Sequence, residues 1–229
     1  MDQARGFNNS HVNYFFNAIN GYTAVRPRKM EDLYYNYIAR GNMQVINMMN
    51  IKYVIQQNDQ GQLDVQKNPS ANGAAWFVKK LEFVEDHKAE FEALKTIDPK
   101  NTVLLREEYK KELGRYIPMR DSVSTISISK TDPDHLVYNA YSSNQSFVVF
   151  SETYYKNGWK ALVDGKEQTI YPVNYMLRGL KLAPGKHTIE FIFEPKVVQT
   201  GSSITLASSV LLLLLLMGAL FFEFKYGKK

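Results

Sequence analysis

The sequence predicts an α+β protein made of a small α+β unit, an antiparallel β-sandwich and one C-terminal transmembrane helix. Three observations carry this prediction. Apolar residues recur with helical spacing near the start of the chain, they alternate with polar residues after Ser122, and an uncharged run occupies Ile204–Phe222. We expect the α+β unit at residues 1–118, the sandwich at 119–196, the helix at 204–222 and a tail at 223–229.

The composition excludes several classes of protein. The chain has 229 residues, no Cys, and 28 basic against 23 acidic residues, for a net charge of +5. Without Cys there is no disulfide scaffold, thiolate zinc site, iron–sulfur cluster or cysteine nucleophile. Of the basic residues, 25 precede position 204 and are interleaved with 22 acidic ones, so the body is nearly neutral. This is not the charge pattern of a nucleic-acid-binding protein, and we expect no nucleic acid partner.

The run Ile204–Phe222 predicts a membrane-spanning helix and its orientation. As a helix it rises about 28 Å, close to the ~30 Å hydrocarbon core of a bilayer. Lys225, Lys228 and Lys229 follow the run, whereas Lys196 is the nearest cation before it. The positive-inside rule therefore places the tail in the cytoplasm and residues 1–203 outside. A tail-anchored protein with a cytosolic body is the alternative.

The first residues, MDQARGFNNS, do not resemble an export signal, because no charged segment is followed there by an apolar one. An extracytoplasmic body therefore needs another route across the membrane. We expect the chain to be a fragment of a longer protein whose upstream membrane spans provide that route.

Before residue 118, helical and strand patterns alternate. Met30, Leu33, Tyr34, Tyr37 and Ile38 predict an amphipathic helix that Gly41 ends. The further expected elements are a short helix over Val45–Met49, strands at Lys52–Gln57, Leu63–Gln66, Ala75–Val84 and Thr102–Arg106, and a helix capped by Asp86 from about His87 to Ile97.

After Ser122 the apolar period becomes two, which predicts half-buried strands. Asp164-Gly165 and Pro184-Gly185 are turn signals between them. Short antiparallel strands at this spacing favour a β-sandwich. The seven expected strands are Val123–Lys130, His135–Ser142, Ser146–Glu152, Trp159–Val163, Gln168–Tyr171, Leu177–Leu182 and Thr188–Glu194.

The sequence contains no catalytic or phosphate-binding signature of the common kinds, such as GxSxG, GxGxxG, GxxxxGK[ST] or HExxH. His11, His87, His135 and His187 are scattered singly, so we interpret them as surface or turn residues and expect no metal site. We expect no cofactor and assign no catalytic residue. A hydrolase built from scattered carboxylates stays open as a rival, without positive evidence.

One aromatic and polar cluster is typical of sugar binding. The stretch Ser151–Trp159 brings together Tyr154, Tyr155 and Trp159, and Asn174 and Arg178 follow one hairpin later. Aromatic rings stack on the apolar faces of sugars, while amide and guanidinium groups bond their hydroxyls. We therefore take these five residues as carbohydrate-binding candidates.

Two structural interpretations compete with this assignment. Trp159 and the tyrosines would close one end of the sandwich core, with Arg178 paired to Glu152 or Asp164. Tyr171 and Tyr175 would simply lie at a membrane interface, where tyrosines are common.

Two long runs resemble a known family. The run SETYYKNGWKALVDGKEQTIYPVNYMLRGLKLAPGKHTIEFIFEP (Ser151–Pro195), followed by a final transmembrane helix, resembles the YfhO-like bacterial membrane protein family. The run NGYTAVRPRKMEDLYYNYIARGNMQVINMMNIKYVI (Asn20–Ile55) is similar to the stretch that precedes this module in the family.

The resemblance implies a longer, polytopic protein with a glycosyltransferase-C-like membrane core, which transfers sugars from lipid-linked donors outside the cytoplasmic membrane. It also implies that the acidic catalytic residues lie in an early extracytoplasmic loop. No such loop is present in this sequence, so no catalytic residue is carried over to it.

We therefore expect the C-terminal, extracytoplasmic and non-catalytic region of a YfhO-like protein that acts in cell-envelope glycan modification. Its partners would be membrane lipid and, through the parent protein, a polyprenyl-phosphate sugar and an envelope glycan. The alternative is a membrane-tethered β-sandwich that binds a glycan or a protein and has no enzymatic parent.

Overall fold

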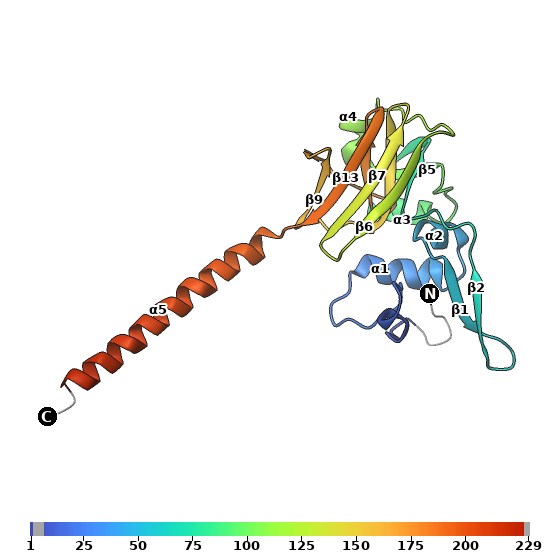
Figure 1. The fold of residues 1–229 in the computed structure, drawn as a ribbon. Helices are drawn as coiled ribbons and strands as arrows, with labels where there is room; N and C mark the ends of the chain where they lie inside the picture. Colours follow the sequence, from blue (N-terminus) through green and yellow to red (C-terminus); the bar gives the residue numbers. More distant parts are fainter. Residues whose placement is uncertain (2–6, 227–229) are drawn as a thin grey trace.

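The computed structural model describes residues 1 and 7–226, and it has the expected α+β architecture with a long C-terminal helix (Figure 1). The first part of the chain contains short helices around a two-stranded parallel sheet and a separate hairpin. Its elements are η1 (Val12–Tyr14), α1 (Arg28–Leu33), η2 (Tyr34–Ile38), α2 (Met43–Met48), β1 (Tyr53–Gln57), β2 (Leu63–Lys67), β3 (Ala75–Val78), β4 (Lys80–Val84), α3 (His87–Ala93), β5 (Thr102–Arg106), η3 (Glu107–Tyr109) and α4 (Lys110–Leu113).

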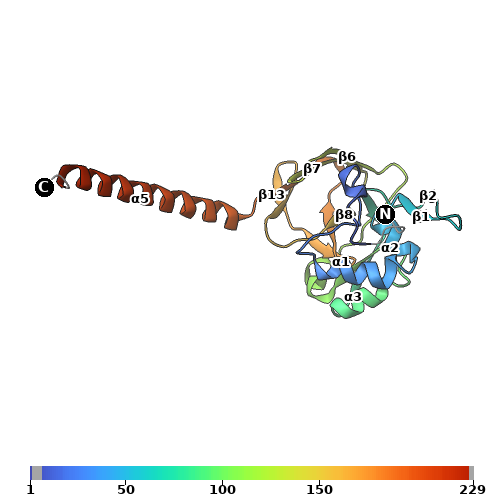
Figure 2. The same cartoon turned by 90° about the horizontal axis from the view of Figure 1, so that it is seen from below.

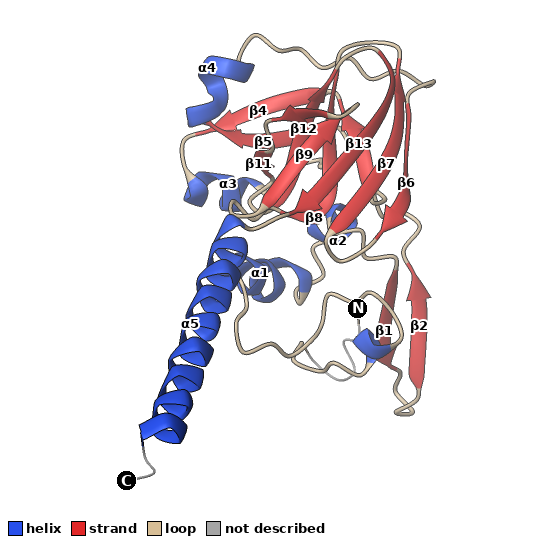
Figure 3. Ribbon diagram, turned by 60° about the vertical axis from the view of Figure 1, so that its left-hand side comes forward, coloured by secondary structure: helices blue, strands red, loops and turns tan. Residues whose placement is uncertain are grey.

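The predicted sandwich is present. A five-stranded sheet in the order β10-β9-β13-β7-β6 faces a four-stranded sheet in the order β11-β12-β8-β3, and all pairs within them are antiparallel (Figure 3). The later strands are β6 (Thr125–Thr131), β7 (His135–Ser142), β8 (Ser146–Thr153), β9 (Trp159–Val163), β10 (Lys166–Gln168), β11 (Tyr171–Val173), β12 (Leu177–Leu182) and β13 (Gly185–Phe193).

Two predicted strands are wrong in their extent, because the chain changes sheets inside them. The predicted strand Ala75–Val84 divides at Lys79, whose N–H bonds to the carbonyl of Asn101; β3 pairs with β8, whereas β4 pairs in parallel with β5. The predicted strand Gln168–Tyr171 divides at residues 169–170, so that β10 joins the five-stranded sheet and β11 the four-stranded one. Since β3 lies in a sandwich sheet, some residues before 118 contribute to the sandwich. The predicted domain boundary after residue 118 stays a prediction.

The four-stranded sheet separates two hydrophobic cores, and β8 is buried on both of its faces. Val148 and Phe150 point into the core between the two sheets, with Tyr138 and Phe191. Phe147 and Val149 alternate with them and pack into the second core, beneath the helices of the first part of the chain. The continuous apolar run of β8 therefore follows from burial on two sides.

The turn between β11 and β12 joins the sandwich to the first part of the chain. Asn174 and Tyr175 both have positive φ angles, +47° and +73°, within the three-residue connection between the paired residues Val173 and Leu177. The side-chain oxygen of Asn174 accepts a 2.8 Å hydrogen bond from the N–H of Leu104, and its own N–H donates to the carbonyl of Leu104 at 3.1 Å. The turn is thus bonded to Leu104 of β5 through both the side chain and the backbone of Asn174.

The C-terminal helix α5 (Lys196–Tyr226) leaves the body from the end of β13, and none of its residues is buried (Figures 1 and 2). It is the one described helix long and apolar enough to cross a membrane. The helix begins before the expected start at Ile204, because residues 196–203 already form the first turns of α5. The positive tail was expected to include residues 227–229, which lie outside the described residues.

We predict that Asn174→Ala destabilises the body by about 2–5 kcal/mol. The loss combines a buried N–H of Leu104 left without its acceptor, about 1–3 kcal/mol, with the cost of a left-handed Ala, about 1–2 kcal/mol. Urea unfolding of the detergent-solubilised chain, followed by tryptophan fluorescence, measures it. Asn174→Gly keeps the backbone freedom and should lose less. An Asn174→Ala loss no larger than that of Asn139→Ala, at an exposed position of β7, would contradict the role of this turn.

Candidate functional site

The structure gathers three of the five candidate residues at one groove. Tyr154, Tyr155 and Trp159 line a cavity of about 190 Å³ against the hairpin β9–β10. The same groove contains polar side chains from both edges: Lys156, Lys160, Glu167, Gln168 and Thr169. Tyr155 is 55% exposed, whereas Tyr154 and Trp159 are half-buried.

Gly158 sets the position of Trp159. Its φ of +105° disfavours any side chain, and a Cβ there would lie 2.7 Å from the ring of Phe193. The next residue, Trp159, therefore packs its indole 5.2 Å from the Phe193 ring. Its ring is also covered by the guanidinium of Arg178, whose Cζ lies 4.1 Å from the ring centroid. A ligand in the groove can stack only on the remaining part of this ring.

Arg178 lies beneath the groove and does not line it. The residue is 3% exposed, its Nε donates to the carbonyl of Thr153 at 2.9 Å, and its Nη1 has no hydrogen-bond partner among the described atoms. Burial lowers the pKa of Arg178 to about 10. The predicted pairing with Asp164 is wrong, because the carboxylate of Asp164 accepts from the N–H of Thr188 and contacts the His187 ring.

Glu152 is the carboxylate that attracts Arg178 across the sheet, although the two form no ion pair within 4 Å. Burial raises the pKa of Glu152, and the nearby Arg178 offsets part of this rise. The phenolic oxygen of Tyr138 is buried beside them without a hydrogen-bond partner among the described atoms. Of these three residues, Arg178 is the one that contacts the ring of Trp159.

The other predicted residues have different surroundings. Asn174 is fully buried in the β11–β12 turn, where its contacts with Leu104 are structural. Tyr171 is also fully buried and donates its hydroxyl to Glu112, so the interpretation of Tyr171 as a membrane-interface residue is wrong. Carbohydrate binding by Asn174 or Arg178 stays a prediction, and neither side chain lines the groove.

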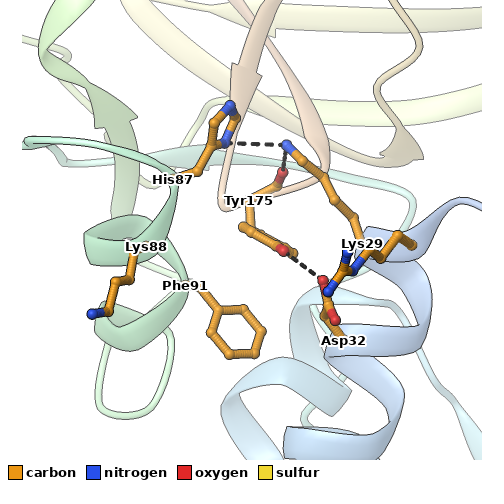
Figure 4. A pocket seen from close by; sticks show the side chains of 7 residues that line it. Lys29, Asp32, His87, Lys88, Phe91 and Tyr175 are labelled. Carbon is orange, nitrogen blue, oxygen red and sulfur yellow. Dashed lines mark hydrogen bonds between the residues drawn. The ribbon is translucent and has the colours of Figure 1, made fainter.

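A second, larger pocket was not predicted from the sequence. It has a volume of about 440 Å³ and lies between α1, α3 and the β11–β12 turn (Figure 4). Lys29 reaches across it, donating to the carbonyl of Tyr175 at 2.7 Å and lying 3.4 Å from Nδ1 of His87. The hydroxyl of Tyr175 donates to Asp32 at 2.8 Å. The remaining lining residues are Arg28, Lys88 and Phe91.

A buried carboxylate, that of Glu90, bonds to residues around this second pocket. Glu90 accepts from the N–H of Tyr175 at 2.8 Å and from Arg106 at 3.2 Å. Burial raises the pKa of Glu90 and lowers the pKa values of Lys29 and His87. Every polar group of Tyr175 is therefore bonded, which fixes its left-handed backbone and the aromatic wall of the pocket.

The lining of the second pocket has an excess of positive charge. Arg28, Lys29 and Lys88 form no ion pair with any residue that the structure describes, while Asp32 is the lining carboxylate. Cations beside two aromatic rings attract anions with an apolar part. Sequence reasoning missed this pocket because its residues come from three separated stretches and each looks like an ordinary surface position.

Within residues 1 and 7–226, no group of His, Asp and Glu is arranged to hold a metal ion.

We predict that Glu152→Gln changes how stability depends on pH. A folded pKa raised above the ordinary 4.5 means that the contribution of this carboxyl is complete below the unfolded pKa and is lost as the pH rises through the folded value. The unfolding free energy of Glu152→Gln, relative to the parent chain, should therefore increase as the pH rises above the ordinary carboxyl pKa of 4.5. Urea unfolding at several pH values measures it. A difference that is the same at every pH would contradict the burial of this charge.

Comparison with known proteins identifies one region. Residues 101–205 match the family model described as bacterial membrane protein YfhO, from β5 through all strands of the sandwich except β3 to the first turns of α5. The run Asn20–Ile55 lies outside the match. Searches of curated proteins and of solved structures found no match. Over residues 101–205, this chain is therefore similar to the bacterial membrane protein YfhO family.

Proposed function

We propose that this chain is the C-terminal, extracytoplasmic and non-catalytic region of a polytopic YfhO-family protein that transfers sugars from a polyprenyl-phosphate donor to a cell-envelope glycan. Its own task is to hold the glycan. The observation that carries this proposal is the groove of Tyr154, Tyr155 and Trp159, on a body that continues into a helix able to cross a membrane. The YfhO match supports the membrane context.

The chemistry of the groove fits a sugar. Aromatic rings present flat apolar surfaces to the C–H faces of a pyranose, and Glu167 and Gln168 offer acceptors and donors for its hydroxyls. The volume of about 190 Å³ is below the ~300–1,000 Å³ of pockets for drug-sized ligands, which favours one sugar ring of a longer chain.

We predict that Tyr155→Ala weakens glycan binding about 2- to 10-fold, because a stacked aromatic contributes roughly 0.5–1.5 kcal/mol beyond its buried area. Saturation-transfer NMR with envelope glycan fragments on the full chain measures it. Tyr53→Ala is the matched control, since Tyr53 is 52% exposed, like Tyr155 at 55%, and lies on the hairpin β1–β2. Equal binding by both variants would overturn the glycan site.

Trp159→Ala should weaken binding further but also remove packing against Phe193 and Arg178. Its circular-dichroism spectrum separates the two effects: lost binding with an unchanged spectrum supports the groove. A variant that unfolds supports instead the interpretation of Trp159 as a lid on the sandwich core.

The alternative is a membrane-tethered sandwich that binds a glycan or a protein and has no enzymatic parent. The groove is compatible with it, because stacking on Tyr154 and Tyr155 needs no catalytic partner. The two proposals differ in the mass of the native polypeptide, which an antibody against residues 122–195 measures in source membranes. A polytopic parent is several times heavier than 26.4 kDa.

We further propose that the body faces the outside of the cell and that the residues after α5 face the cytoplasm, which the lysines flanking the apolar run support. Because the chain has no Cys, single cysteines test this directly. In intact cells, a membrane-impermeant maleimide should label Ser143→Cys, while Gly227→Cys should be labelled only after permeabilisation. The reverse pattern would overturn the orientation.

A further inference from the structure

The most exposed apolar surface of the body is a stretch near the start of the chain, residues 12–25, here named the aromatic segment. It carries five large apolar side chains that are between 65% and 86% exposed. Large aromatics this exposed are unusual in a soluble surface and mark contact sites. They are Tyr14, Phe15, Phe16, Tyr22 and Val25.

The backbone around these side chains is held in place. The N–H of Gly21 donates to the carbonyl of Phe7 at 2.8 Å, and the N–H of Tyr22 donates to the hydroxyl of Ser10 at 2.8 Å. Phe7 stacks on Tyr34 with ring centroids 3.7 Å apart. This anchors the base of the segment to the helical stretch α1–η2. The rings are therefore presented outward by a bonded loop.

The aromatic segment lies on the side of the body from which the membrane helix departs. In Figures 1 and 3, both it and α5 extend below the sheets. Since α5 begins directly after Pro195, only about 12 Å of helix separates the body from Ile204, where the uncharged run starts. This helical connection keeps the body close to the bilayer surface. The usual tilt of a membrane helix, about 20°, can bring one side of the body closer still.

The charge pattern of the segment matches the interfacial layer of a membrane. From Val12 to Val25 no residue carries a charge, and the polar ones are mostly Asn. Directly after it come Arg26, Arg28 and Lys29. Tyrosine and other aromatics gather at membrane–water interfaces, and neighbouring cations are attracted to phosphate headgroups. Arg28 is available for this, because it has no ion-pair partner within the described part of the chain.

We propose that the aromatic segment inserts its rings into the interfacial layer of the same membrane that α5 spans, giving the body a second point of contact with lipid. This contact is independent of the glycan groove. Phe15 and Phe16 enter the layer, and Arg28, which follows the segment, contacts the headgroups.

The test uses the full chain in vesicles of phosphatidylethanolamine and phosphatidylglycerol. Phe15→Cys is labelled with an environment-sensitive fluorophore, which is specific because the chain has no other Cys. Val123→Cys is the matched control: Val123 is 56% exposed and precedes β6. The register of β6, β7 and β13 puts the start of β6 beside Gly185, at the opposite end of the sandwich from Pro195.

The expected result is a blue-shifted emission from the label at position 15 that brominated phospholipid quenches, with neither effect at position 123. A label at position 15 that stays as water-exposed as the control overturns the proposal. A blue shift that brominated lipid does not quench, and that grows with the protein-to-lipid ratio, also overturns it and indicates association between copies. Phe16→Cys repeats the measurement if the first variant fails to fold.

Discussion

The arrangement of the body depends on the burial of β8 on both faces. Within four consecutive residues, Phe147 and Val149 belong to one core while Val148 and Phe150 belong to the other. A shift of its pairing by one residue would exchange the two sets of side chains, so the register with β12 and β3 is strongly determined. That register places Arg178 beneath Trp159 and brings the first part of the chain onto the sandwich. The positions of both pockets therefore depend on how β8 is paired.

Local patterns in the sequence were sufficient where structure is locally determined. Asp86 caps α3 through bonds to two backbone N–H groups, and Asp164-Gly165 turns β9 into β10, as predicted. The same patterns failed where the chain changes layers. Nothing in the alternation around Lys79 indicates that β3 and β4 pair with different partners, because periodicity reports burial and not the neighbouring strand. Helix α3 is likewise shorter than predicted, ending at Ala93.

The residues of the candidate site also include some that local sequence patterns predict and some that they do not. Tyr154, Tyr155 and Trp159 are five positions apart at most, so a single loop brings them to one groove. Arg178 and Asn174 come from the next hairpin, and their distance from the surface depends on packing that no spacing reveals. Glu90 is the clearest example: it has the sequence context of an exposed helical acid, yet it is fully buried beneath the second pocket. Only the assembled fold shows which charges lack a partner.

The continuity of α5 with the body has a mechanical consequence. A helix of 31 residues rises about 46 Å, of which the uncharged run accounts for about 28 Å and fits the ~30 Å hydrocarbon core. Only Glu194 and Pro195 separate β13 from α5, so a change in helix tilt with bilayer thickness is passed to the sandwich through a short connection. The groove of Tyr155 would then point in different directions in thin and thick membranes. The lipid composition of the membrane would thereby affect the direction in which the groove faces.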